Sequence, residues 1–144
     1  MTKGELAKEY FESGRNCSQS VALAFSKELN LTEDQIKKLT IGFGGGFARS
    51  RLVCGAVSGM TLVLSALISD GEDRKPIYEI LQSAYKKVKE ELGSLICQDL
   101  LNGVKVTDGA NPEPRNSEYY AKRPCAEICK IIADITQEIL EENR

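Results

Sequence analysis

The chain has no histidine and no tryptophan among its 144 residues. Without histidine it cannot form a Ser–His or Cys–His catalytic pair, an HExxH zinc site or a histidine-ligated haem. Lysine, glutamate, tyrosine and cysteine remain as acid–base groups. Cysteine is the unusual one, because the chain carries five of them. These absences direct the search for function to thiol chemistry.

The sequence also lacks a long uninterrupted apolar run and a strong excess of one charge. Its longest apolar stretch, residues 52–68, is broken by glycine, serine and threonine and is too short and too polar for a membrane span. The formal net charge is −2, which gives no basic footprint for nucleic acid. Residues 1–6 carry no apolar signal segment. We therefore predict a cytoplasmic protein without a membrane or nucleic-acid partner, in a reducing compartment.

Helical patterns follow one another along the chain, and no pair of segments shows the alternation that is typical of strands. Helices are expected over residues 5–13, 16–29, 32–42, 52–69, 76–92, 94–101 and 125–142. Asn16 is expected to cap the second of them, and Thr32 with Gln35 fits a capping box for the third. The fold class is therefore predicted to be all-α. We expect one compact domain over residues 1–144, a bundle of about six or seven helices around a central apolar helix at 52–69.

Two segments are expected to be irregular. Residues 42–47, the glycine loop, hold four glycines in five residues, which heavily penalises a helix. The loop lacks the GKS/T ending of a phosphate-binding P-loop, so a turn over the cysteine site is the favoured interpretation. Residues 104–124, the 104–124 connection, contain Pro112 and Pro114 and are long for a structureless connection. With Tyr119 and Tyr120, this segment is predicted to act as a lid.

The five cysteines contain no CxxC pair, which excludes a thioredoxin-like motif and a zinc ribbon. Their positions are more informative than their spacing, because four fall close to the beginnings of four expected helices. Free N–H groups and the helix dipole stabilise an anion there and lower the pKa of a thiol. These four cysteines are Cys17, Cys54, Cys97 and Cys125.

Arginines near three of these cysteines favour the thiolate in the same direction. Arg15 precedes Cys17, Arg49 and Arg51 precede Cys54, and Arg123 precedes Cys125. Cys97 has Asp99 nearby instead, so we expect it to be the least acidic of the four and to act as a resolving thiol or a shared ligand.

A cysteine is also a small apolar residue that is often buried and inert. Cys129 fits that role, because it shares a helix face with isoleucines, although it lies one turn after Cys125 and can reach the same centre. Cys54 fits it worst. Gly55 and Gly59 follow it one turn apart, which indicates close approach of either a neighbouring helix or a cofactor.

The segment Cys54-Gly55-Ala56-Val57-Ser58-Gly59 resembles the motif of the C_GCAxxG_C_C family of redox-active proteins, which is marked by CGAxxG and four characteristic cysteines. The resemblance extends along the chain through Asn16-Cys17-Ser18-Gln19, the glycines at 44–46, Ile96-Cys97-Gln98-Asp99 and Cys125. It implies a helical protein with a redox or metal-binding role, in which Cys129 is an extra cysteine.

Three functions are left open. The first is thiol–disulfide or electron-transfer chemistry in a thiol-dependent oxidoreductase with Cys17, Cys54, Cys97 and Cys125 as catalytic residues. Gly55, Gly59 and Arg51 are the expected cofactor-binding residues. In the second, the same four cysteines are metal ligands for an iron–sulfur cluster or zinc, since four thiolates suit both. The third is a helical interaction domain with inert buried cysteines. The expected partner is a redox protein or a small thiol, and a homodimer is compatible with the sequence.

Overall fold

The computed structural model describes residues 1–143 and is built from helices. Within these residues the only β pairing is an isolated bridge between Val53 and Ile96. The all-α prediction is therefore confirmed. The elements are α1 (Lys3–Glu12), α2 (Cys17–Leu23), α3 (Ser26–Leu29), α4 (Glu33–Thr40), the 3-10 turn η1 (Ile41–Phe43), α5 (Gly55–Ile68), α6 (Arg74–Leu92), α7 (Cys97–Leu101), α8 (Ser117–Lys122) and α9 (Cys125–Glu142).

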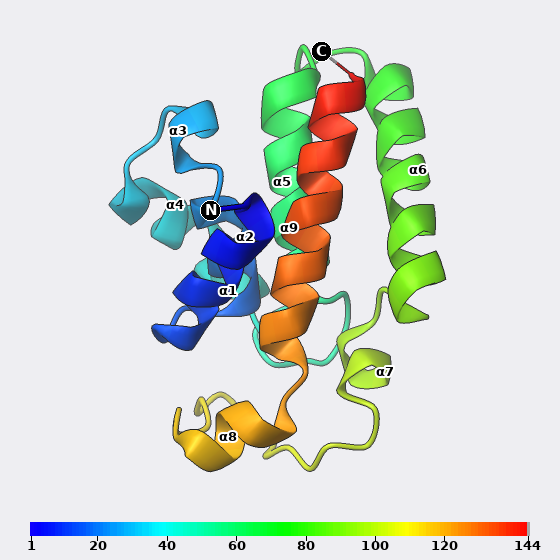
Figure 1. Ribbon diagram of the computed structural model, residues 1–144. Helices are drawn as coiled ribbons and strands as arrows, with labels where there is room; N and C mark the ends of the chain where they lie inside the picture. Colours follow the sequence, from blue (N-terminus) through cyan, green and yellow to red (C-terminus); the bar gives the residue numbers. More distant parts are fainter. Residues whose placement is uncertain (144) are drawn as a thin grey trace.

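The three longest helices, α5, α6 and α9, run alongside one another, with α5 and α9 in the middle of the bundle (Figure 1). α9 packs against α1, α5 and α6, and α5 packs against α2. α5 and α9 both begin at the end of the molecule where α7 and α8 lie (Figure 1). The bundle therefore brings the N-terminal ends of helices that are distant in sequence to one place.

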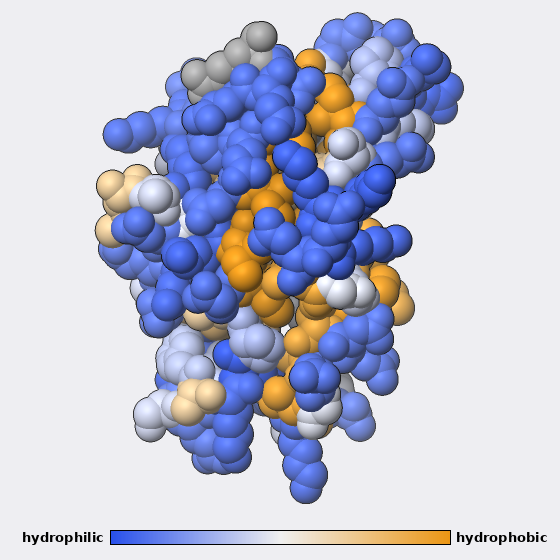
Figure 2. Space-filling view, turned by 45° about the vertical axis from the view of Figure 1, so that its right-hand side comes forward, coloured by the Kyte–Doolittle hydropathy of each residue, from blue (hydrophilic) through white to orange (hydrophobic). Residues whose placement is uncertain are grey.

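The core between these helices is apolar, and its largest fully buried side chains come from six different helices and one helix junction. Each such side chain contributes roughly 1.5–3 kcal/mol to folding when it is removed from water. These side chains include Phe11, Leu23, Phe25, Ile36, Met60, Leu64, Val88 and Ile132. On the face drawn in Figure 2, apolar atoms are gathered in a strip between hydrophilic side chains. The helices are amphipathic, as the sequence pattern predicts.

Several helices begin at the N-terminal capping residues that the sequence predicts. The Asn16 side chain accepts a hydrogen bond from the Gln19 backbone N–H, and the Gln19 side chain accepts one from Asn16 N–H. Thr32 and Gln35 form the same reciprocal box at α4. Such caps satisfy backbone donors that have no partner inside the helix, which fixes the residue at which each helix begins. The box at Asn16 makes Cys17 the first residue of α2.

Three details differ from the prediction. The helix expected at 16–29 is divided at Phe25, whose φ of −109° and ψ of 22° interrupt α2 and α3. α5 begins at Gly55 because residue 53 pairs with residue 96 instead of entering the helix. The 104–124 connection contains α8, capped by Asn116. The two extra short helices, α3 and α8, give nine α-helices within residues 1–143.

Among the described residues, no helix is both long enough and apolar enough to cross a membrane.

Candidate thiol site

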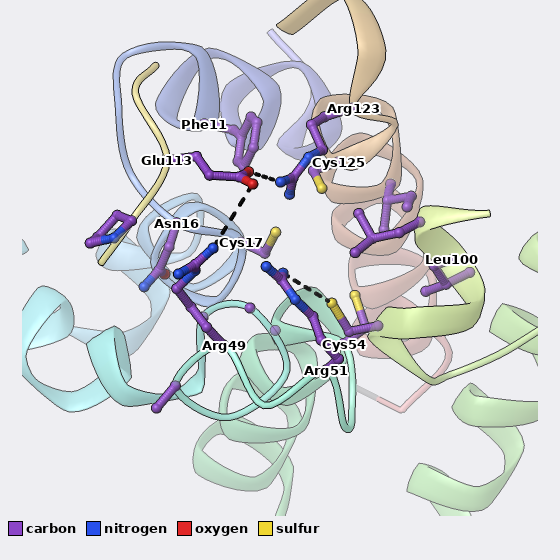
Figure 3. Close-up of a pocket in the computed structure, with 18 of the residues that line it drawn as sticks. Phe11, Asn16, Cys17, Arg49, Arg51, Cys54, Leu100, Glu113, Arg123 and Cys125 are labelled. Carbon is purple, nitrogen blue, oxygen red and sulfur yellow. Dashed lines mark hydrogen bonds and ion pairs between the residues drawn. The ribbon is translucent and has the colours of Figure 1, made fainter. Parts of the chain in front are cut away.

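Four cysteines lie at the beginnings of four helices. Cys17, Cys97 and Cys125 are the first residues of α2, α7 and α9, and Cys54 is the residue that precedes α5. All four line one cavity of about 290 Å³. In Figure 3 the sulfur atoms of Cys17, Cys54 and Cys125 lie around the same space. The structure thus brings together the four cysteines that the sequence singles out, and their catalytic role stays a prediction.

The two glycines of the CGAxxG segment bring α5 close to α2. A Cβ atom added to Gly59 would lie 2.9 Å from the Ser18 carbonyl oxygen, and one added to Gly55 would lie 3.2 Å from Cys17 Cβ. Gly55 and Arg51 line the cavity, whereas Gly59 packs against α2 away from it. Helix packing is therefore sufficient to account for Gly59, and it places Cys17 beside the beginning of α5.

A short backbone pairing holds Cys54 and Cys97 in place. The Cys54 N–H donates to the Leu95 carbonyl oxygen at 2.8 Å, and the Cys97 N–H donates to the Leu52 carbonyl oxygen at 2.6 Å. These bonds flank the bridge between Val53 and Ile96. Sequence patterns did not indicate this pairing, because it involves too few residues to produce a strand signal.

The chain between η1 and α5 is strongly strained. Gly45 and Gly46 have positive φ, and so do four non-glycine residues, each at a cost of roughly 1–2 kcal/mol; these are Phe47, Ala48, Arg49 and Arg51. Hydrogen bonds from Arg51 N–H to the Gly45 carbonyl oxygen and from Leu52 N–H to the Gly46 carbonyl oxygen hold the turn. This turn places the side chains of Arg49 and Arg51 in the lining of the cavity (Figure 3). Strain of this kind concentrates at functional sites.

The 104–124 connection lies over the cavity and supplies part of its wall, including Pro112, Glu113, Arg115 and Tyr119. Arg115 donates hydrogen bonds to the carbonyl oxygens of Phe11 and Arg15, and its guanidinium lies 4.3 Å from the centre of the Phe11 ring. The connection is thus on the side of the molecule where a lid is needed. Its movement stays a prediction.

Arg49 holds this connection against the glycine loop. Its guanidinium donates to the carbonyl oxygens of Thr107, Gly109 and Asn111. The Arg49→Ala variant is expected to release the connection, because at least three hydrogen bonds that the charged guanidinium donates are lost together. Amide hydrogen exchange of residues 105–113 should accelerate at least about tenfold. The Arg74→Ala variant, at the exposed beginning of α6, is the matched control, and equal exchange in both variants would contradict the assignment.

The arginines that lie beside the thiols in the structure are not all the ones that lie next to the cysteines in the sequence. Arg51 lies with one guanidinium nitrogen 4.0 Å from Cys97 Sγ, so Cys97, which was expected to lack an arginine, has one. Arg123 lies near Cys125, as expected from its position, and its charge lowers the pKa of that thiol. Arg15 is not among the residues that line the cavity, whereas Arg115 is. Arg115 and Glu113 were missed, because only the folded connection places them beside the thiols.

The prediction of acidic thiols is wrong. Burial raises the pKa of the Cys54 thiol from 9.0 to about 12, although the backbone N–H groups of Val57 and Ala56 oppose the shift. Burial also raises the pKa of Cys97 against the effect of Arg51. Removal of a thiolate from water outweighs a nearby guanidinium at these positions. The thiols are therefore protonated at neutral pH.

The pKa of Cys17 depends on two neighbouring thiols, those of Cys125 and Cys129. The hydrogen bond with Cys125 lowers the pKa of Cys17, but the hydrogen bond with Cys129 and burial raise it, and the net pKa is well above 9.0. The hydrogen bond with Cys17 raises the pKa of Cys125, as does burial. Cys129 is fully buried in the core, and its thiol lies 3.9 Å from the Cys17 carbonyl oxygen. Cys129 is thus both a core residue and a neighbour of the site.

The raised thiol pKa makes the stability of the fold sensitive to alkaline pH. Below pH 9 the Cys54 thiol is protonated in both the folded and the unfolded chain, so its full contribution to the free energy of unfolding is present. Between about pH 9 and about pH 12 the unfolded chain loses this proton and the folded chain keeps it. The free energy of unfolding should therefore fall with rising pH, with a contribution from Cys54 of about 1.4 kcal/mol per pH unit. Urea unfolding under reductant from pH 7 to 10.5 measures this slope.

The Cys54→Ala variant separates this thiol from the other groups that titrate at alkaline pH. It is expected to be less stable at pH 7 and to lose stability less steeply above pH 9. Parallel curves for the two proteins would show that Cys54 does not cause the effect.

The arrangement of the four thiols differs from that of a zinc site. Within residues 1–143, no three or more His, Cys, Asp or Glu side chains form a group that could hold a metal ion. The four thiols surround a cavity and are not gathered around one point, as a tetrahedral zinc site requires. The geometry therefore does not fit a zinc ion held by Cys17, Cys54, Cys97 and Cys125.

Comparison with known proteins gives the family. Residues 15–139 match the family model described as "Putative redox-active protein (C_GCAxxG_C_C)". The chain belongs to this family. An uncharacterized protein of Archaeoglobus fulgidus is 31% identical over 161 aligned positions, which cover 100% of this chain and 99% of the relative. No solved structure matches the chain. The resemblance that the cysteine pattern indicates is thus confirmed. The family to which the chain belongs is described as redox-active.

Proposed function

We propose that the protein is a cytoplasmic thiol–disulfide oxidoreductase in which Cys17 and Cys125 form the redox couple. The observation that carries this proposal is that both cysteines are the first residues of helices, α2 and α9, and line the same cavity. Both are partly exposed, whereas Cys54, Cys97 and Cys129 are buried. All five cysteines are free thiols, which suits a reducing compartment.

Cys17 is the attacking thiol in this proposal. The Cys17 thiolate attacks one sulfur of a small disulfide, so that a protein–substrate disulfide forms and the first substrate thiolate leaves. This leaving group takes up the proton that Cys17 released.

Cys125 then resolves the mixed disulfide. It loses its proton, attacks the Cys17 sulfur and releases the second substrate thiol, which takes that proton. The substrate disulfide gains two electrons and the protein loses two, leaving a disulfide between the two cysteines. The positive charge of Arg123 favours the Cys125 thiolate. A second thiol reagent reverses both steps.

The experiment counts thiols and products. The reduced protein is incubated under argon with bis(2-hydroxyethyl) disulfide, and free thiols and released 2-mercaptoethanol are measured. We expect two of the five thiols to disappear and two equivalents of 2-mercaptoethanol to form, in a product that stays one chain on a non-reducing gel. Five unreacted thiols, or disulfides formed only between chains, would overturn the proposal.

An iron–sulfur cluster on the same cysteines is the second candidate. It is favoured by the four thiols that line one cavity and by the ligand number that such clusters require. It ranks second because these thiols form no ligand group of three or more in the described residues. Anaerobic purification followed by a visible spectrum and metal analysis distinguishes it. A coloured protein with stoichiometric iron would support the cluster.

A further inference from the structure

The cavity that holds the thiols has an excess of positive charge. Its lining contains four guanidinium groups and one carboxylate, from Arg49, Arg51, Arg115, Arg123 and Glu113. Charges in a partly buried cavity are costly unless they are paired.

Two of the four guanidinium groups have structural partners. Arg49 is bound by carbonyl oxygens of the 104–124 connection, and Arg115 by those of Phe11 and Arg15. The guanidinium N–H groups of Arg49 and Arg115 thus hold the wall of the cavity in place. Their role is therefore explained without a ligand.

The other two guanidinium groups, those of Arg51 and Arg123, donate to no backbone carbonyl oxygen within the described residues. Within residues 1–143, the Arg51 side chain forms one hydrogen bond, to Cys97 Sγ at 4.0 Å. The Arg123 side chain is only 6% exposed. Its Nη2 atom forms an ion pair with the Glu113 carboxylate, and its guanidinium lies 4.8 Å from the centre of the Tyr119 ring. The two groups are close enough for the charge of Arg51 to disfavour that of Arg123.

We propose that Arg51 and Arg123 bind the carboxylate groups of a small dianionic disulfide, which is the substrate of the dithiol couple. This inference rests on the proposed function for the redox step, and on the charges alone for the binding step. Guanidinium groups match carboxylates in geometry and charge. The apolar parts of such a ligand meet Phe11, Leu100 and Ile128, which line the same cavity. A volume of about 290 Å³ suits a small molecule.

Glu113 occupies part of this site in the structure. Its carboxylate pairs with Arg123 and lies 4.0 Å from a guanidinium nitrogen of Arg49 (Figure 3). Because Glu113 belongs to the 104–124 connection, movement of the connection would exchange this carboxylate for that of the ligand. The Glu113→Gln variant should therefore bind a dianion more tightly than the natural chain.

The binding step is tested with an unreactive probe. Suberate has the length and charge of 3,3′-dithiodipropionate but carries methylene groups in place of the two sulfurs. Calorimetry of the full chain should detect suberate binding, weakened about tenfold in the Arg51→Gln and Arg123→Gln variants. It should be unchanged in the Arg74→Gln control and several-fold tighter in Glu113→Gln. Absence of binding to the natural chain, or equal binding in all variants, would overturn the site.

The redox step is tested with three disulfides that differ in charge. The dianionic 3,3′-dithiodipropionate should oxidise the protein at least about tenfold faster than neutral bis(2-hydroxyethyl) disulfide, and dicationic cystamine should be slowest. Arg51→Gln should remove this order, and Arg123→Gln serves if the first variant does not fold. Equal rates for the three reagents would overturn the inference and leave the dithiol couple intact. Suberate binding without oxidation by any of them would instead refute the couple and support the anion site.

Discussion

Replacing Cys17 by serine is expected to reduce the reaction with small disulfides at least about a hundredfold. A serine hydroxyl is not a nucleophile toward a disulfide at neutral pH, and the exchange proceeds through a thiolate. The remaining cavity thiols substitute poorly, because Cys54 is 5% exposed and has a pKa raised to about 12. The measurement is the rate of 2-mercaptoethanol release from bis(2-hydroxyethyl) disulfide by the reduced variant.

The Cys125→Ser variant is expected to fail at a different step. Cys17 can still attack, but the mixed disulfide with the substrate is not resolved. Intact-mass spectrometry should therefore find one substrate half attached to the chain, and one equivalent of released thiol instead of two. The Cys129→Ala variant is the control, because this cysteine is outside the lining of the cavity. It should form the intrachain disulfide, and a complete loss of reaction in it would contradict the assignment of the couple.

Replacing Gly46 by alanine is expected to destabilise the fold by about 3 kcal/mol. Gly46 has a φ of +71°, where alanine costs roughly 1–2 kcal/mol. An added Cβ would also lie 2.6 Å from the Leu52 backbone nitrogen and 2.7 Å from Cys97 Cβ. Overpacking of this kind typically costs another 1–3 kcal/mol. Urea unfolding under reductant measures the loss, and faster alkylation of Cys97 would report that α7 has shifted.

Gly42 offers the matched control. It lies four residues earlier, and an added Cβ would meet no atom within 4 Å. The Gly42→Ala variant should therefore change the free energy of unfolding by less than about 0.5 kcal/mol. Equal destabilisation by the two substitutions would show that the close approach of Gly46 to Cys97 does not hold the site together.

The fold class and the positions of the cysteines could be predicted because both depend on local signals. The caps at Asn16 and Thr32 and the apolar stripe of α6 determine where helices begin and which side they bury. Four cysteines near expected helix beginnings then line one cavity, because the packing of the helices brings their N-terminal ends to one place. The bond pattern between residues 52–54 and 95–97 was not predictable, since it joins segments that are distant in sequence.

The acidity of the thiols could not be predicted, because it depends on burial. An arginine near a cysteine in the sequence indicates a stabilised thiolate only if both groups remain in contact with water. In the folded chain Cys54 is withdrawn from water, and Arg51 lies beside Cys97. Residue Glu113 reaches the site from a connection whose path no periodic pattern determines.

The most direct test of the dithiol couple is a peptide map of the oxidised protein. The reduced chain is treated with bis(2-hydroxyethyl) disulfide, its free thiols are alkylated, and the protease digest is analysed without reduction. We predict one linked pair of peptides, joined through Cys17 and Cys125, with Cys54, Cys97 and Cys129 alkylated. A linkage that excludes Cys17 or Cys125, or a complete set of five alkylated cysteines, would contradict the account.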